Sequence, residues 1–372
     1  MGKLKTIFLN LLATVNIVVI VLMLLSGYSD HFSPEKYPLL ACAGMFFPFT
    51  VIANLLFVPI WVLLSWKRLL ISIAGFLLAF PPIRIYMPLH ARVEVPDDAL
   101  CVVSYNVCGY GGNFKYDAGM DTIFNYLKAR GADIVCTQED NESKFHNMWQ
   151  RYTEFYAYND TTNVSESNVI KNCVGIHSRF PILRKEVIPY DAPSNGSIAY
   201  FLQVGADTVL VINNHLEQSH LNNKDRSRYE EMLESNLARN VIENEKTRDT
   251  VTTETRDLMG KLTQGMKIRA RHVEIIHQYI EEHRQYPIIS CGDFNDTPIS
   301  YAHHVMAKGL TDCFVESGRG LGLSFNRKGF NLRIDHMMCS SHFTPLQCEI
   351  DDKMDASDHY PLLCWLKMRE KP

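Results

Sequence analysis

Asp293 and Asn295 stand two residues apart in the segment 289–298, which reads ISCGDFNDTP. The apolar residues before them are typical of a buried strand, and Gly292 at the strand end allows a backbone or a ligand to approach closely. Side chains alternate along a strand, so we expect Asp293 and Asn295 to point to one side while Phe294 packs on the other. Such a pair could position a water molecule and bind a phosphate oxygen.

Five further segments place polar side chains at or beside the end of an apolar or β-branched run. They are 102–107 with Asn106, 133–139 with Glu139, 209–216 with His215, 333–337 with Asp335, and 357–361 with Asp358 and His359. Hydrolysis of a phosphoester requires neutralised charge and an oriented nucleophile, because the bond is very inert in water. This repeated placement of amide, carboxylate and imidazole groups therefore indicates a metal-assisted phosphoester site.

The ordered set of motifs, GDFN and SDH among them, resembles the endonuclease/exonuclease/phosphatase superfamily, in the form of a membrane-anchored, bacterial-type member. That superfamily includes DNase I-like nucleases, abasic-site endonucleases, neutral sphingomyelinases and inositol polyphosphate 5-phosphatases. The resemblance covers roughly residues 98–368. It implies an α/β fold, the four-layer α/β/β/α sandwich.

The resemblance also implies a metal site. Glu139 is the expected ligand, since Mg²⁺ prefers one or two carboxylates together with water and substrate oxygens. Asn106 would help to hold the site, and Asp358 would lie close to the ion. Mn²⁺ is the alternative ion, because it suits the same oxygen ligands.

The remaining motif residues have catalytic roles in this resemblance. Asp293 would orient or deprotonate the attacking water, and Asn295 would hold a phosphate oxygen. His359 would face the phosphate while Asp335 fixes its tautomer. His215 would stabilise developing charge or protonate the leaving oxygen. Whether Asp293 or His359 is the base stays open, because the two would titrate together. His336 is expected to be structural.

The N-terminus predicts a membrane anchor. Residues 6–25, 39–65 and 69–85 are three apolar stretches, the third interrupted by Pro81-Pro82. We therefore expect about three transmembrane helices within residues 1–90, a linker at 91–98, and a catalytic domain at 99–372.

Basic residues predict the orientation of this anchor. Lys3 and Lys5 precede the first stretch, and Lys67-Arg68 lie between the second and third. The positive-inside rule assigns both to the cytoplasm. Three spans would then place the catalytic domain on the extracytoplasmic side. If the short third stretch is only interfacial, the domain lies in the cytoplasm instead.

The net charge bears on nucleic acid as a partner, and the cysteine spacing bears on the state of the thiols. Six of the 37 basic and two of the 41 acidic residues precede residue 91, so the remainder has a net charge of −8. Proteins that grip DNA usually show a basic stripe, so nucleic acid is not favoured as a partner. The 10 cysteines form no CxxC motif, and buried thiols are expected.

Residues 217–284 are polar, rich in charge and largely helical in pattern, with breaks at Gly260 and Gly265. The earlier half, 217–262, is predicted to be an insertion beside the site. The stretch 268–280 has apolar residues at helical spacing and is expected to dock on the sheet. The insertion is interpreted as a solvated helical excursion or, alternatively, as a lid that selects substrate.

The leading hypothesis is a membrane-anchored, Mg²⁺-dependent phosphoesterase. Its substrate would be a membrane-proximal phosphate ester such as a lipid head group. One alternative is a Mg²⁺-dependent nuclease on the same site. Another is a catalytically idle scaffold, which the retained carboxylates and histidines disfavour. The sequence leaves open the natural substrate, monoesterase versus diesterase action, and the oligomeric state.

Overall fold

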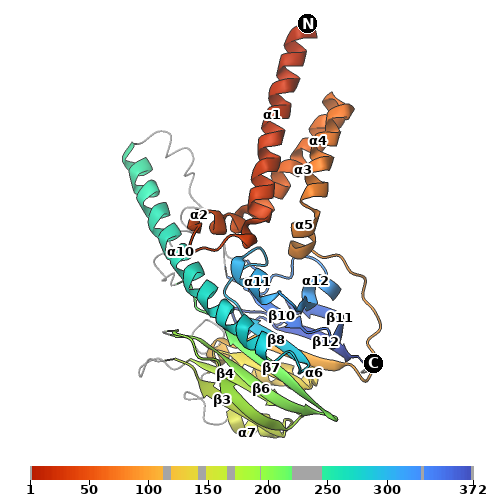
Figure 1. Ribbon diagram of the computed structural model, residues 1–372, viewed down its shortest axis with the longest axis vertical. Helices are drawn as coiled ribbons and strands as arrows, with labels where there is room; N and C mark the ends of the chain where they lie inside the picture. Colours follow the sequence, from red (N-terminus) through yellow and green to blue (C-terminus); the bar gives the residue numbers. More distant parts are fainter. Residues whose placement is uncertain are drawn as a thin grey trace.

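The computed structural model describes residues 2–111, 119–140, 148–165, 172–192, 194–219, 245–327 and 331–369. Two six-stranded sheets lie face to face beneath a bundle of N-terminal helices (Figure 1). Helices cover the outer face of each sheet, so the predicted four-layer sandwich is confirmed.

The first sheet has the strand order β11-β12-β1-β2-β4-β3. Its central strand β1 pairs in parallel with β2 and antiparallel with β12. Every residue of β1 and β2 is buried, as expected for strands covered on both faces. The strands are β1 Leu100–Asn106, β2 Ile134–Gln138, β3 Tyr158–Asn163, β4 Cys173–Ser178, β11 Phe343–Ile350 and β12 Leu362–Met368.

The second sheet has the strand order β5-β6-β7-β8-β10-β9. β7 and β8 are parallel neighbours, and β10 is antiparallel to β8. β6 and β7 form an antiparallel hairpin whose turn contains Gly205, with a φ of +59°. The strands are β5 Ile182–Val187, β6 Gly196–Val204, β7 Asp207–His215, β8 Ile288–Asp293, β9 Thr311–Asp312 and β10 Asp335–Cys339.

Three apolar clusters hold the layers together. The inner one joins the two sheets and includes Val102, Tyr200 and Met337. The first sheet is covered on its outer face by α6 (Gly119–Arg130) and α7 (Met148–Thr153). The second is covered by α10 (Glu245–Glu282) and α11 (Tyr301–Met306). All ten cysteines are buried free thiols, in agreement with the sequence interpretation.

The predicted helix breaks at Gly260 and Gly265 are wrong, because α10 runs through both. Gly265 has a different role. A Cβ at this position would lie 2.9 Å from the Cα of Ser219, so the glycine lets the chain after β7 cross close to the helix. The predicted end of the insertion at residue 262 thus falls inside one continuous helix. The part of the insertion at 220–244 lies outside the described residues.

The N-terminal apolar stretches form three helical passes (Figure 1). α1 (Gly2–Gly27) and the segment Pro38–Leu64, which contains α2 (Pro38–Ala41) and α3 (Phe47–Leu64), are each long and apolar enough to cross a membrane. The third pass is Trp66–Leu78 followed by α5 (Phe80–Tyr86), bent by 59°. Its main helix, α4 (Leu69–Leu78), packs against both α1 and α3. The bundle therefore has two helices that could span a membrane, or three if the bent pair counts as one span.

The helical bundle packs directly on the two-sheet sandwich. Ile299, on the loop after β8, is buried with Met23, Phe47 and Ala79. A Cβ on Gly44 would lie 2.1 Å from the carbonyl oxygen of Ile299, so only glycine fits there. Ion pairs surround this contact, with Arg271 to Glu35 at 2.6 Å and Arg84 to Glu316 at 2.9 Å. Because these contacts come from several elements, the sandwich has a fixed orientation beneath the bundle.

Candidate active site

Strand register brings the motif residues to one end of the sandwich. Asn106 faces Gln138 across β1 and β2, which places Glu139 one residue further on. In the other sheet, Asp293 lies opposite His215 on one side and opposite Asp335 on the other. The two groups meet through Asn106, whose Nδ2 lies 3.3 Å from Glu139 Oε1 and 3.1 Å from Asp293 Oδ2. Both sheets therefore contribute to a single site.

Glu139 is held in an unusual backbone conformation. Its φ is +52°, a left-handed conformation that few non-glycine residues adopt. The next residue, Asp140, accepts hydrogen bonds from the hydroxyls of Tyr110 (2.7 Å) and Thr137 (2.7 Å), which fix the turn. The Glu139 side chain is 22% exposed, whereas that of Asp293 is only 2% exposed. Burial and then the neighbouring Asp358 raise the pKa of Glu139.

Asp335 and His359 are joined by a direct hydrogen bond within the site. His359 Nδ1 lies 2.8 Å from Asp335 Oδ2, so the carboxylate accepts a hydrogen bond from the Nδ1–H group and leaves Nε2 facing the site. Ser324 Oγ accepts the backbone N–H of Asp335 at 3.0 Å and fixes the start of β10. Burial lowers the pKa of His359, but Asp335 and Asp293 outweigh this effect and raise it to about 10. The imidazole is therefore charged at neutral pH.

Asp293 is positioned by its own turn. Its Oδ1 accepts the backbone N–H of Asn295 at 2.8 Å. Gly292 has a φ of +139°, and a Cβ there would lie 1.9 Å from the carbonyl oxygen of Asn214. Any residue other than glycine would therefore prevent the close approach of β7 and β8. Burial raises the pKa of Asp293 to about 7, although the neighbouring His359 acts in the opposite direction. A carboxyl group with this pKa can accept a proton near neutral pH.

His215 is completely buried and lies between two carboxylates. Its Nε2 is 3.8 Å from Glu139 Oε1 and 3.7 Å from Asp293 Oδ2, both too long for a hydrogen bond. Within the described part of the chain, neither ring nitrogen has a hydrogen-bond partner. Burial, followed by repulsion from His359, lowers the pKa of His215 to about 3, so the ring is neutral. A neutral imidazole here still has one N–H to donate to a ligand.

Asn295 and Asp358 lie at the edge of this cluster. Asn295 has a φ of +51°, and its Nδ2 donates to the carbonyl oxygen of Leu216 at 2.9 Å. Asp358 Oδ2 accepts from Arg327 Nε at 2.9 Å. All eight predicted site residues thus lie in one region of the protein, where their hydrogen bonds and charges connect them. Their individual roles remain predictions.

The residues present fit a divalent cation. Glu139 and Asp358 supply carboxylate oxygens, which are the hard donors that Mg²⁺ and Mn²⁺ prefer. Asn106 donates from Nδ2 to Glu139 and Asp293, while its Oδ1 accepts the backbone N–H of Cys108 at 3.0 Å, so the amide orients these carboxylates. The unpartnered ring of His215, facing two carboxylates, is the kind of buried polar atom that a metal-bound or substrate group would satisfy. Asp293, Asp335 and His359 also present potential ligand atoms that all lie within 4.8 Å of one another.

Several supporting residues have no obvious signal in the sequence. Ser357 Oγ donates to the carbonyl oxygen of Asn106 at 2.8 Å and ties the last motif to β1. Asn213 accepts from Gln138 Nε2 at 2.6 Å and links the two sheets behind the site. Arg327 was also missed, since nothing in its local sequence marks a partner for Asp358. His336 instead contacts the carbonyl oxygen of Asp296 at 2.9 Å, which fits the structural role expected for it.

Two six-stranded sheets with a carboxylate, amide and histidine cluster at their strand ends define a DNase I-like phosphoesterase fold. The model for the "Endonuclease/Exonuclease/phosphatase family" matches residues 103–359. The chain therefore belongs to this family. A second model, "Domain of unknown function (DUF8431)", matches residues 9–86, the helical bundle.

Solved structures share the fold at low sequence identity. A humanized TDP2 of D. rerio is 15% identical over 73% of this chain and 99% of its own, with a TM-score of 0.50. A family protein from Bacteroides thetaiotaomicron is 17% identical over 75% and 100%, with a TM-score of 0.50. The human Nocturnin catalytic domain with bound sulfate is 15% identical over 77% and 99%, also with a TM-score of 0.50. No curated protein sequence matches the chain.

Proposed function

We propose that this protein is a membrane-anchored, divalent-metal-dependent phosphoesterase that hydrolyses a phosphate ester carried by a membrane lipid or held close to the bilayer. One observation carries the proposal. The loop that leaves the catalytic strand β8 packs at Ile299 among Met23, Phe47 and Ala79 of the bundle. Asp293 is thus six residues from a direct contact with the membrane helices.

The chain's own groups suit attack on a phosphorus centre. A cation held by Glu139, with Asn106 and Asp358 nearby, would supply charge neutralisation at the phosphate. Asp293, with its raised pKa, would take a proton from the attacking water at Oδ2. His359, charged and oriented by Asp335, would donate from Nε2 to a phosphate oxygen.

His215 and Asn295 complete the proposed arrangement. His215 is neutral and buried, so it would donate one N–H to the phosphate or to the leaving oxygen without adding charge. The Asn295 side chain is oriented by its bond to Leu216, and its amide would hold a phosphate oxygen. Each of these groups occupies a strand end or the following turn, so the protein backbone determines its position.

The catalytic domain is proposed to lie on the extracytoplasmic side. α4 packs along both α1 and α3, which supports a third crossing at the same depth as the other two. Three crossings from a cytoplasmic N-terminus lead to the opposite side. Accessibility of an engineered cysteine at exposed Arg256 to an impermeant maleimide in intact cells would test this topology. Labelling only after lysis would assign the domain to the cytoplasm.

A nuclease on the same site is the second candidate. The family includes nucleases, but the −8 charge of the chain after residue 90 opposes binding to long nucleic acid. The bundle contact also restricts access from one side. These observations favour a compact phosphate ester over a polymer.

The test uses the full chain in phosphatidylcholine vesicles, as wild type and as Glu139→Ala/His359→Ala. The substrates are p-nitrophenyl phosphate, bis-p-nitrophenyl phosphate, plasmid DNA, RNA and vesicle-embedded phospholipids, with Mg²⁺, Mn²⁺ or EDTA. We expect the wild type to hydrolyse a vesicle-embedded phospholipid in the presence of the metal ion. The double variant should lack this activity. Hydrolysis confined to DNA or RNA would establish the nuclease instead. A folded wild-type protein that cleaves nothing would support an idle scaffold.

A further inference from the structure

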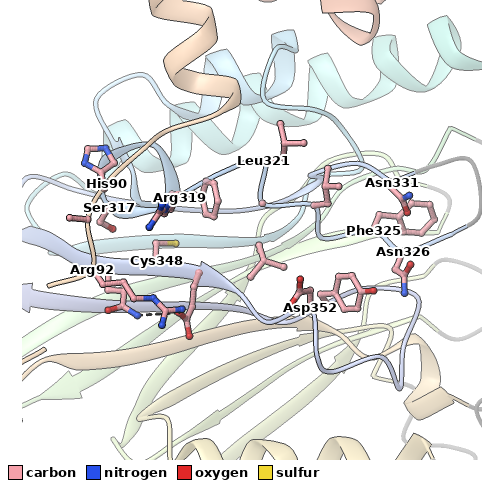
Figure 2. A pocket seen from close by; sticks show the side chains of 18 residues that line it. His90, Arg92, Ser317, Arg319, Leu321, Phe325, Asn326, Asn331, Cys348 and Asp352 are labelled. Carbon is pink, nitrogen blue, oxygen red and sulfur yellow. Dashed lines mark hydrogen bonds and ion pairs between the residues drawn. The ribbon is translucent and has the colours of Figure 1, made fainter. Parts of the chain in front are cut away.

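A groove of about 880 Å³ lies beside the active site (Figure 2). Its walls come from the linker after α5, from α12 (Cys313–Ser317), from β11 and from the segment 319–326. This volume is within the range of sites that bind small molecules, roughly 300–1,000 Å³. None of the eight predicted site residues lines it, so the groove is a separate feature of the chain.

One end of the groove adjoins the active site. Phe325 lines the groove, and its ring centroid is 5.0 Å from that of His359. The backbones of these two residues form a β-bridge. The N–H of Asn326, another lining residue, donates to the carbonyl oxygen of Asp358 at 2.8 Å. A ligand in the groove would therefore be separated from the catalytic imidazole by a single side chain.

The other end adjoins the membrane bundle. The linker leaves α5 at Tyr86, and Leu89 forms a β-bridge with Arg319. Around this bridge, exposed apolar side chains accompany the polar ones: Leu89 is 72% exposed and Leu321 is 43% exposed. Apolar side chains next to arginines are typical of protein surfaces that contact the lipid–water interface. The groove thus extends from the base of the bundle to the active site.

The polar groups of the groove are not uniform along its length (Figure 2). Arg319 is exposed at the end near His90, and no acidic side chain among the described residues is within 4.0 Å of its guanidinium. Arg92 already pairs with Glu349 at 3.3 Å. Asn326, Asn331 and Asp352 lie on the side of Phe325, away from His90, as Figure 2 shows. Arginine suits an anion, whereas amides and a carboxylate suit hydroxyl groups.

From this arrangement we infer that the groove binds the part of a membrane-anchored substrate beyond its scissile phosphate. The inference rests on the proposed function and specifies its substrate class. The class is a lipid with a terminal phosphate monoester, a hydroxyl-bearing spacer and a second phosphate next to the lipid tail. The spacer lies along the amides, and the second phosphate binds Arg319 while the tail remains in the bilayer near Leu89 and Leu321.

The reaction on such a lipid is a simple hydrolysis. Water attacks the terminal phosphorus, the bond from phosphorus to the spacer oxygen breaks, and the spacer oxygen takes up a proton. The products are inorganic phosphate and a lipid alcohol that keeps the second phosphate. Arg319 contacts only the part that does not react, so it is a specificity-determining residue.

The test compares two lipids that release inorganic phosphate, each embedded in phosphatidylcholine vesicles. Phosphatidylglycerol phosphate contains the spacer and the second phosphate, and phosphatidic acid lacks both. The full-length protein is assayed as wild type, as Arg319→Gln, as Arg256→Gln and, to identify activity that depends on the site, as His359→Ala. Arg256 is a matched control because it is exposed on α10 and does not line the groove.

The wild type is expected to favour phosphatidylglycerol phosphate in kcat/KM. Arg319→Gln should lower kcat/KM on that lipid by about tenfold to a hundredfold, the contribution of a lost charged hydrogen bond. The loss should appear mainly in KM and should be several-fold smaller on phosphatidic acid. Arg256→Gln should behave as wild type on both.

Three results would overturn the inference. The first is an equal kcat/KM of the wild type on the two lipids. The second is an equal loss of kcat/KM on the two lipids in Arg319→Gln. The third is the same loss of kcat/KM in Arg256→Gln as in Arg319→Gln. In each case hydrolysis that depends on His359 would persist, and the proposed function would stand. If neither lipid is hydrolysed and activity dependent on His359 appears only on nucleic acid, the proposed function itself fails. Matching thermal unfolding of the variants and wild type would exclude misfolding as the cause.

Discussion

Two buried clusters of polar side chains in this protein differ in how completely their hydrogen bonds are made. The first lies within the N-terminal helical bundle, where Asn16 Oδ1 accepts from Trp61 Nε1 at 2.8 Å and from Ser72 Oγ at 2.9 Å. Asn16 Nδ2 donates to Asn54 Oδ1 at 2.9 Å. All four residues are fully buried. This cluster joins three helices and leaves none of these atoms without a partner.

The second cluster is the candidate active site. Within the described residues, both ring nitrogens of His215 and Oδ1 of Asp335 have no hydrogen-bond partner. Burial also raises the pKa of Asp293 and lowers that of His215. Unpartnered buried groups cost free energy that a stabilising network would avoid. The difference indicates that the bundle cluster serves packing, whereas the strand-end cluster keeps groups available for a ligand.

The largest expected effect on turnover comes from substitution of Asp293, which should reduce activity without reducing stability. Asp293→Asn removes the proposed proton acceptor but keeps nearly the same shape. Turnover of the phosphate ester should fall about 10³-fold, within the usual range for loss of a general base. The free energy of unfolding should stay the same or rise, because a desolvated carboxyl group is gone. Steady-state kinetics and thermal unfolding measure the two quantities. A large loss of stability with modest loss of turnover would make Asp293 a structural residue.

Asp335→Asn is expected to have the next largest effect. The charge that orients His359 would be lost, so turnover should fall by about 10²-fold or more while the protein stays folded. Asp312 is a matched control, because it forms a similar buried pair with His303 at 2.6 Å outside the site. Asp312→Asn should lower stability and leave turnover close to wild type. Equal turnover losses in both variants would contradict the orienting role of Asp335.

The pH profile of kcat/KM should have two limits. Activity should increase as pH rises toward about 7, where Asp293 loses its proton, and decrease above about 10, where His359 loses its own. The raised pKa of His359 also stabilises the fold. This contribution is complete below its ordinary pKa of 6.5 and is lost as pH rises through about 10. Asp335→Asn should move the alkaline limit to lower pH, and an unmoved limit would assign it to another group.

The sequence could predict that the motif residues lie together, because most of them follow a local rule. Asn106, His215 and Asp293 each end a buried strand and Glu139 directly follows one, and neighbouring strands of a sheet bring their ends together. Arg327 lies in a loop, and its pairing with Asp358 depends only on tertiary structure. The left-handed turn at Glu139 was equally invisible, since it depends on Asp140 and its hydroxyl partners.

Glycine positions show the limit of sequence patterns in the fold. Gly265 suggested a helix break, yet a glycine within a helix costs only about 1 kcal/mol relative to alanine, and α10 tolerates it. The reason for this glycine is the crossing chain at Ser219. Gly44 is similar, because its role is to let Ile299 approach the bundle. Contacts between residues distant in sequence decided both cases.

The smallest expected effect concerns the bundle cluster, where removal of a partner should change stability without changing chemistry. Asn16→Leu leaves the Trp61 N–H, the Ser72 hydroxyl and the Asn54 carbonyl without their shared partner. It should lower the free energy of unfolding by about 1–2 kcal/mol. Trp61→Phe removes one of these bonds and should cost about 0.6 kcal/mol. Thermal unfolding in detergent followed by circular dichroism measures both, and turnover on p-nitrophenyl phosphate should match wild type. Reduced turnover in a variant that is still folded at the assay temperature would show that the bundle takes part in catalysis. The contrast between the two clusters would then fail.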